Sequence, residues 1–238
     1  MRVEGVPMRT FILAMSALLA IAAPASAATR SFGITDFTKV RVDGPYRVTV
    51  STEVAPFAKA SGSPAALDRL AVEVRGDTLV VQSNASSWGG YPGKDPGPVE
   101  VTVGTHDLTD AWLNGAGSLD IDRVKGLSFA LSVQGSGAGH IHQVSADQMS
   151  VSVVGTASAK LAGEAKKLVA LVRGISTLDA ASLQAHDATV GAEGAATIDA
   201  AVSDAVTVEA SGTSTIRFAG QPSCTLKVKG STSVSGCR

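Results

Sequence analysis

The chain has 238 residues, of which 45% are hydrophobic and only 4% aromatic, and its formal net charge is −1 at pH 7. Lysine and arginine are scattered along the sequence, which argues against a nucleic-acid-binding surface. Beyond residues 1–27, no apolar stretch is long enough to span a membrane, and the remaining chain has the length of one ordinary domain, residues 28–238.

Residues 1–27 have the layout of a secretory signal peptide. Arg9 precedes an apolar run that is too short to cross a bilayer, and the run ends in Ala25-Ser26-Ala27, a small-residue pattern that signal peptidase cleaves. Met8 is an alternative start, because a basic residue directly before the apolar run is the usual arrangement. The sequence therefore predicts an exported protein in the periplasm, at the cell surface or secreted.

A strand-rich lead-in, residues 28–105, follows the leader. Phe37–Val50 alternates between apolar and polar residues, Leu70–Val81 reads as a hairpin that turns at Gly76-Asp77, and Val99–Val103 is a further strand. We expect this lead-in to cap one end of the region that follows, because the open end of a repeat protein exposes unpaired strand edges.

Residues 106–238 repeat one short pattern seven times. The repeats are anchored by glycines at spacings of 20, 20, 19, 20, 18 and 18 residues. These are Gly115, Gly135, Gly155, Gly174, Gly194, Gly212 and Gly230. A period of this size is typical of a solenoid, in which each unit buries its apolar face only against its neighbours.

Apolar and polar residues alternate on both sides of each glycine. Before Gly155 the apolar positions are Met149, Val151 and Val153, and after it they include Leu161. Each repeat is therefore predicted to be a strand, a tight glycine corner, a short strand and a turn. A period of two argues against helix, and identical columns favour coils in parallel register over an antiparallel meander.

The sequence thus predicts an all-β fold: a single-stranded, right-handed parallel β-helix with 18–20 residues per turn. The right hand is expected because parallel crossovers are overwhelmingly right-handed, and the six-residue period of left-handed β-helices is absent. A polar column, five residues after each glycine, is expected on the outer surface. It contains Asp120, His140, Lys160, Asp179, Asp199 and Arg217.

Cys224 and Cys237 are the only cysteines, and both fall in the last repeat. In an exported protein two cysteines usually pair, and a crosslink here would stop the final coil from fraying. Two free thiols are the alternative. A redox-active pair is disfavoured because the chain has no Cys-x-x-Cys motif.

Four segments carry a family resemblance: Phe37–Val50, Asp77–Val81, and the glycine cores Asn114–Gly117 and Gln134–Gly137. Through them the chain from about residue 37 to residue 238 resembles the bacterial exported domains described as "putative auto-transporter adhesin, head GIN domain". The resemblance implies a pectin-lyase-like solenoid, that is, a β-helix similar in shape to pectin lyases, with an adhesive role and no recognised catalytic residues. Later repeats depart from the family's second glycine, which puts the geometry of their corners in question. The substituted residues are Ala157, Ser176, Ala196, Ser214 and Thr232.

Two histidines form the one cluster with metal-ligand character. His140 and His142 lie two residues apart on one predicted strand, so both project from the same face. Stacking places Asp120 and Asp122 of the preceding repeat beside them, and the four residues are conceivable as a weak cation site. The alternative is a set of solvated surface residues. We assign no metal-binding, cofactor-binding or catalytic residue.

The other polar residues do not form an enzyme's constellation. The outward acids are spread over several repeats, and Lys160 and Arg217 stand apart from each other. Ser136 lies between two glycines and is interpreted as a corner residue rather than a nucleophile. The aspartate-rich nonapeptide that binds calcium in secreted solenoids is absent. We therefore expect no enzymatic activity and no cofactor.

Three aromatic residues are candidates for binding. Trp112 occupies a column that is expected to face outward in other repeats, as at Ser132 and Ser152. Trp88 and Tyr91 lie in the glycine- and proline-rich loop 86–98. Exposed aromatic rings stack on sugars or anchor protein partners. The alternative is that the loop folds back over Trp112 as a small satellite core.

These observations predict a non-catalytic module of the cell envelope that acts in adhesion or interaction. Its partner would be a surface or envelope protein or a polysaccharide. The alternative is a carbohydrate-binding or carbohydrate-cleaving protein of the pectin-lyase-like class. A third possibility is a structural element that associates with itself as a homo-oligomer.

Overall fold

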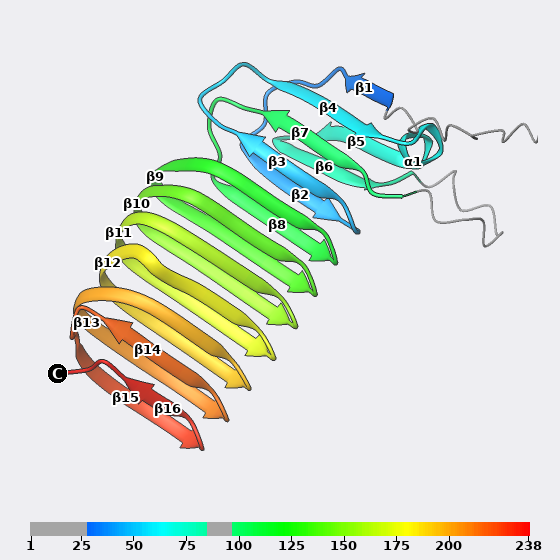
Figure 1. Cartoon of the computed structure of the whole chain (residues 1–238). Coiled ribbons are helices and arrows are strands. Elements are labelled where there is room, and N and C mark those ends of the chain that lie inside the picture. Colours follow the sequence, from blue (N-terminus) through cyan, green and yellow to red (C-terminus); the bar gives the residue numbers. More distant parts are fainter. Residues whose placement is uncertain (1–27, 85–96) are drawn as a thin grey trace, which may run out of the picture.

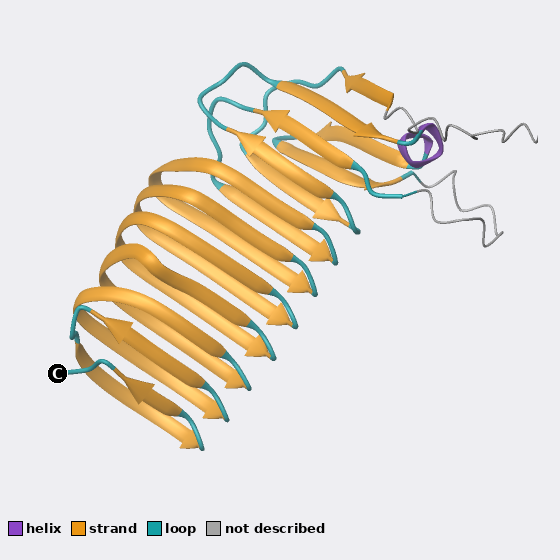
Figure 2. Cartoon of the chain, in the orientation of Figure 1, coloured by secondary structure: helices purple, strands orange, loops and turns teal. Residues whose placement is uncertain are grey.

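The computed structural model describes residues 28–84 and 97–238, which coil into an elongated β-solenoid (Figure 1). Strands account for 74% of the structure and helix for 3%, and about six turns stack along the axis (Figure 2). The prediction of an all-β parallel coil is confirmed, whereas its right-handed sense stays a prediction. The predicted signal peptide lies outside the described residues, as do Trp88 and Tyr91.

Strands stacked in parallel form the body of the solenoid. In chain order they are β8 (Asp110–Gly115), β9 (Ser118–Gly135), β10 (Ala138–Gly155), β11 (Ser158–Gly174), β12 (Thr177–Gly194), β13 (Thr197–Gly212), β14 (Thr215–Ala219), β15 (Ser223–Gly230) and β16 (Ser233–Ser235). Their ladders pair the corner glycines in one unbroken register, from Gly115 through Gly155 to Gly230. Each sequence repeat is therefore one coil.

The core is a thin apolar column enclosed by three sides of each coil. On the side before the glycine, Met149, Val151 and Val153 are at most 3% exposed, and Ile141 is fully buried on the side after it. The third side, predicted only as a turn, is also a parallel ladder and buries Val144. A side this short has too few inward positions to show an alternating pattern in the sequence.

The corners tolerate loss of the second glycine because only the first has a left-handed backbone. Gly155, for example, has φ of +105°, whereas the second corner position has no positive φ in any described coil. Ser176 and Ser214 occupy that second position and are buried. Their hydroxyls donate to the carbonyls of Arg173 (3.0 Å) and Gly194 (3.1 Å). The substitutions therefore leave the fold of the corner intact.

Two strands of the lead-in belong to the solenoid itself. β2 (Lys39–Asp43) stacks in parallel on β8, and β3 (Arg47–Ser51) stacks in parallel on β9. The corner between β2 and β3 lies at Gly44, whose φ is +126°. The first coil is thus separated from the second by a long insertion, residues 52–109, and region 28–105 is partly coil and partly cap.

The insertion ends the parallel stack by reversing strand direction. β6 (Thr78–Ser83) and β7 (Glu100–Gly104) still stack in parallel, on β2 and β3 respectively. Beyond them the pairs are antiparallel: β5 (Leu70–Arg75) on β6, β4 (Phe57–Gly62) on β7, and β1 (Ala28–Phe32) on β4. The β5–β6 pair is the hairpin expected from the sequence. The short helix α1 (Pro64–Asp68) follows β4, and within the described ranges no helix has the length and apolar character needed to cross a membrane.

The opposite end of the solenoid has no cap in the described chain. Leu226 and Val228 of β15 continue the inward columns of Val208 and Ala210, yet they are 47% and 38% exposed because no coil stacks on them. A disulfide between Cys224 and Cys237 crosses this last coil, with the two Cα atoms 5.7 Å apart. The predicted pairing is confirmed.

Removal of this disulfide is expected to loosen the last coil. With Cys224→Ser and Cys237→Ser together, we expect the free energy of unfolding of the last coil to fall by about 2–3 kcal/mol, because the crosslink closes a loop of 13 residues in the unfolded chain. Hydrogen exchange should lose protection in β15 and β16 while β10 and β11 keep theirs. An equal loss of protection in every coil would contradict this assignment.

Candidate functional site

One side of the solenoid carries a flat strip without charge. It consists of the outward positions five and three residues before the corner glycine in β9, β10, β11 and β12, and most of these residues are half-buried. They are Ala130, Ser132, Ser150, Ser152, Val169, Leu171, Thr189 and Gly191. We call this surface the flat strip. Charged residues such as Arg173 and Glu193 flank it. At Gly191 a side chain would meet Leu171, so the glycine leaves room for the leucine to lie along the strip.

A depression of about 740 Å³ adjoins the flat strip at its N-terminal end. Trp112 lies there, half-buried and in register with Ser132, as its column in the repeats predicts. Arg41 and Asp43 on β2 form an ion pair of 2.9 Å at the same place, and the side-chain amide of Asn114 donates to Asp43 over 2.7 Å. The Trp112 groove therefore combines an aromatic ring with fixed donors and acceptors.

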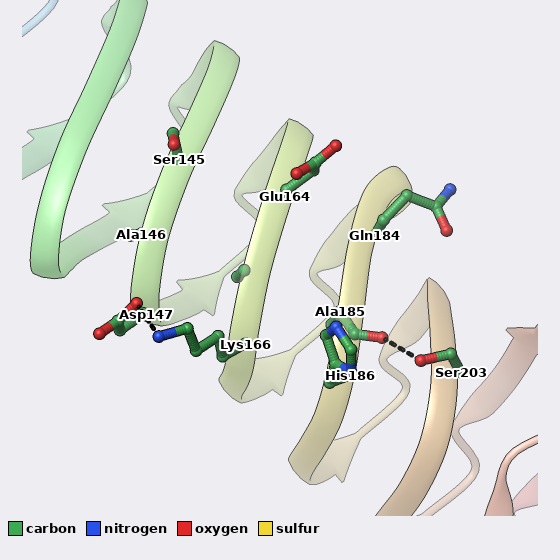
Figure 3. A pocket seen from close by; sticks show the side chains of 10 residues that line it. Ser145, Ala146, Asp147, Glu164, Lys166, Gln184, Ala185, His186 and Ser203 are labelled. Atoms are coloured by element: carbon green, nitrogen blue, oxygen red, sulfur yellow. Dashed lines mark hydrogen bonds and ion pairs between the residues drawn. The ribbon is translucent and has the colours of Figure 1, made fainter.

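The third side of the coils contains a second groove of about 520 Å³ (Figure 3). The register between β12 and β13 shifts twice beside it. Between Ala180 and Gln184, β13 has three residues fewer than β12, and between Ala185 and Asp187 it has one more. His186 lies at the second shift, beside the Asp147–Lys166 ion pair of 2.8 Å. Change of register, rather than a cluster of reactive groups, shapes this groove.

Asp120, His140 and His142 converge on the side that follows each glycine. His142 Nε2 lies 2.9 Å from one carboxylate oxygen of Asp120, and His140 Nδ1 lies 3.4 Å from the other. The two imidazole rings lie 3.9 Å apart, measured between their centroids. We call these three residues the His–Asp cluster. Each is at least one-third exposed at its side chain, so the cluster faces solvent.

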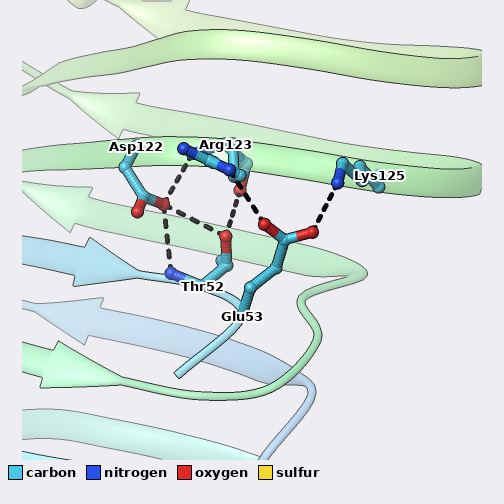
Figure 4. A network of polar contacts seen from close by, with 5 residues as sticks. All are labelled: Thr52, Glu53, Asp122, Arg123 and Lys125. Carbon is cyan, nitrogen blue, oxygen red and sulfur yellow. Dashed lines mark hydrogen bonds and ion pairs between the residues drawn. The ribbon is translucent and has the colours of Figure 1, made fainter.

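The prediction that Asp122 joins this cluster is wrong. Its carboxylate instead accepts hydrogen bonds from the backbone N–H of Thr52 (3.0 Å) and from the Thr52 hydroxyl (3.1 Å) (Figure 4). Thr52 directly follows β3, which stacks on β9. The Asp122 side chain is therefore hydrogen-bonded to the first coil and not to His142.

The same contact region holds Glu53 between two cations (Figure 4). Lys125 donates to one carboxylate oxygen of Glu53, and Arg123 donates to the other over 2.9 Å. These hydrogen bonds, that of Lys125 first, hold the pKa of Glu53 below its usual value. The network joins the first coil to the second and is exposed, so we interpret it as structural.

Most charges of the polar column pair with the next coil. Lys160 lies 3.5 Å from Asp179, and Arg217 lies 3.2 Å from Asp199. Each pair bridges two adjacent coils and leaves its members engaged with each other. This arrangement resembles a series of exposed structural ion pairs more than an acid and a base held on opposite sides of a substrate.

Solved structures similar to this one support the fold. A protein of Bacteroides fragilis NCTC 9343 described as a "putative adhesin" matches with a TM-score of 0.78 at 16% identity, covering 89% of this chain and 97% of that chain. A "putative lipid binding protein" of Parabacteroides distasonis ATCC 8503 matches with a TM-score of 0.71 at 18% identity, covering 87% and 95%. At such low identity these likenesses establish the solenoid fold alone.

The sequence comparison gives the family. No functionally curated protein matches the chain. Residues 36–222 match the family described as "putative auto-transporter adhesin, head GIN domain", which includes both strands of the first coil and nearly all of the corner glycines. The match covers most of the chain, and the protein therefore belongs to the head GIN domain family.

Proposed function

We propose that this protein is an exported, non-catalytic module that acts in adhesion or interaction at the cell envelope. In this proposal residues 1–27 are a cleaved signal peptide, and residues 28–238 form one binding domain. The flat strip supports the proposal most directly, since its eight outward positions carry no charge and span four adjacent coils. When a partner covers an uncharged surface of short side chains, the free-energy cost of desolvation is small, and so is the loss of side-chain entropy.

The Trp112 groove gives the flat strip an anchoring point. Tryptophan is enriched among the residues that dominate binding energy, and arginine and amide groups beside it supply directional hydrogen bonds. This combination also supports the second candidate function, carbohydrate binding, because a sugar offers an apolar face for the ring and hydroxyls for Arg41, Asp43 and Asn114. The partner of an adhesion module would be a surface or envelope protein or a polysaccharide, and that of the second candidate a carbohydrate.

Two substitutions separate these candidates once a screen has returned a ligand. The purified protein would first be applied to a glycan array and to immobilised envelope proteins, with calcium and with chelator. If the partner covers both the flat strip and the Trp112 groove, Leu171→Glu in the strip and Trp112→Ala in the groove should each weaken binding by at least about tenfold. Ile175→Glu is the matched control, because Ile175 is 72% exposed at a corner outside the strip.

The pattern of losses decides between the two. Loss with Trp112→Ala alone, and full binding with Leu171→Glu, would favour a carbohydrate held in the groove. Unchanged binding by both variants, measured by calorimetry on folded protein, would refute the proposed surface.

A further inference from the structure

We propose that Asp120, His140 and His142 bind a divalent transition-metal ion of the Zn²⁺ type. The histidines come from β10 and the aspartate from β9, which are adjacent coils. One ligand atom from each of the three side chains lies within 4.8 Å of the others. In residues 28–84 and 97–238 no other set of three or more His, Cys, Asp or Glu side chains meets that criterion.

The distances fit a single ion. Zn²⁺ binds histidine nitrogen and carboxylate oxygen at about 2.0–2.2 Å, which separates neighbouring ligands of a tetrahedral site by roughly 3.3–3.5 Å. The Asp120 carboxylate lies 2.9 Å from His142 Nε2 and 3.4 Å from His140 Nδ1. Small rotations of exposed side chains therefore bring the three atoms to coordinating distance, without movement of the backbone.

The type of ligand selects the metal. Two imidazoles and one carboxylate suit Zn²⁺, Ni²⁺, Cu²⁺ or Fe²⁺, whereas Ca²⁺ and Mg²⁺ prefer oxygen ligands alone. The two cysteines are joined in a disulfide and do not compete for such an ion. The strand places both histidines on one face, because residues two apart project to the same side. Asp120 lies in the neighbouring coil, about 4.8 Å away.

The surrounding residues leave the cluster free to bind a cation. Lys160, which follows His140 in the ladder, is 3.5 Å from Asp179 on its far side. Thr49, which precedes Asp120 in the ladder, carries no charge. Both oxygens of Asp120 contact only the two histidines among the side-chain contacts of the described chain.

Bound metal would crosslink two coils and still face solvent. Three protein ligands leave at least one coordination position open, which water or a carboxylate or histidine of a partner surface can occupy. The ion would therefore link β9 to β10, and its open coordination position could bind a ligand from a partner surface. This inference does not depend on the flat strip, which lies on a different side of the coil.

Titration of purified, untagged protein with ZnCl₂ tests the proposal. Isothermal titration calorimetry should give one Zn²⁺ per chain, and His140→Ala, His142→Ala and Asp120→Asn should each weaken binding by at least about tenfold. Co²⁺ offers a second readout, since a site with two imidazoles and a carboxylate gives visible absorption that the same variants should remove.

His106→Ala is the matched control. His106 Nδ1 lies 3.1 Å from Asp36, so this pair resembles the cluster but lacks its third ligand. The variant should bind Zn²⁺ as the parent protein does. The proposal is overturned if the parent does not bind Zn²⁺, if the His140→Ala/His142→Ala double variant binds it equally well, or if His106→Ala loses as much affinity as His142→Ala. Far-UV circular dichroism confirms that each variant is folded.

Discussion

Replacing Gly155 by alanine is expected to lower the free energy of unfolding by about 3 kcal/mol or more. The residue has φ of +105°, a conformation that costs a residue with a side chain about 1–3 kcal/mol. A Cβ atom at this position would also lie 2.5 Å from the carbonyl oxygen of Gly135 in the preceding coil. That oxygen accepts a hydrogen bond from the N–H of Thr156 over 2.8 Å, so it cannot move without breaking the ladder.

Gly126→Ala separates the two contributions to this effect. Gly126 also has a positive φ, +138°, but a Cβ there would meet no atom within 4 Å. We expect it to cost only about 1 kcal/mol, from backbone strain alone. Urea unfolding followed by circular dichroism measures both variants. If Gly155→Ala were no more harmful than Gly126→Ala, close approach of the stacked corners would not be the reason for the repeated glycine.

Leu161→Ala is expected to destabilise the protein by about 2–5 kcal/mol. Leu161 is fully buried and stacks on Ile141 in the preceding coil. Truncation leaves a cavity that the structure cannot close, because the hydrogen-bonded ladder holds adjacent coils about 4.8 Å apart. The loss should therefore lie in the upper part of that range.

Leu127→Ala is the control with identical chemistry. Leu127 is 79% exposed, and its truncation should change the free energy of unfolding by no more than about 0.5 kcal/mol. Both variants are compared by their urea midpoints and slopes. Equal destabilisation by the two would mean that the inward and outward columns have been assigned to the wrong faces.

The glycine columns predicted the coil because each turn of a solenoid repeats the same local backbone conformation and the same contacts with its neighbour. Positive φ at Gly155 and close contact with Gly135 recur at each corner, so the same residue is needed once per turn and the register can be read directly. The alternation around Gly155 then assigns the buried and exposed faces. The pairing of Cys224 with Cys237 was predicted on a different ground, since two cysteines in an exported protein usually pair.

The long-range contacts were not predictable in this way. β2 and β3 form a coil of their own, but the insertion of residues 52–109 hides their relation to β8 and β9. Asp122 was misplaced for the same reason, because its partner Thr52 lies 70 residues away and belongs to no repeat column. The spacing from Gly194 to Gly212 is 18 residues, against 20 from Gly174 to Gly194. The sequence did not reveal that the two missing residues are lost from the third side of the coil.

The last described coil, which has a stacked neighbour on one side only, determines how this part of the molecule would respond to tension. A load applied beyond β15 would break the ladder hydrogen bonds between β15 and β13 in succession, since among the described strands β15 pairs with β13 alone. Each released coil of 18–20 residues would lengthen the chain by roughly 60 Å. The Cys224–Cys237 crosslink keeps 13 residues of the last coil from extending, so the first step would be shorter by about 40 Å. Tension would thus lengthen the molecule one coil at a time.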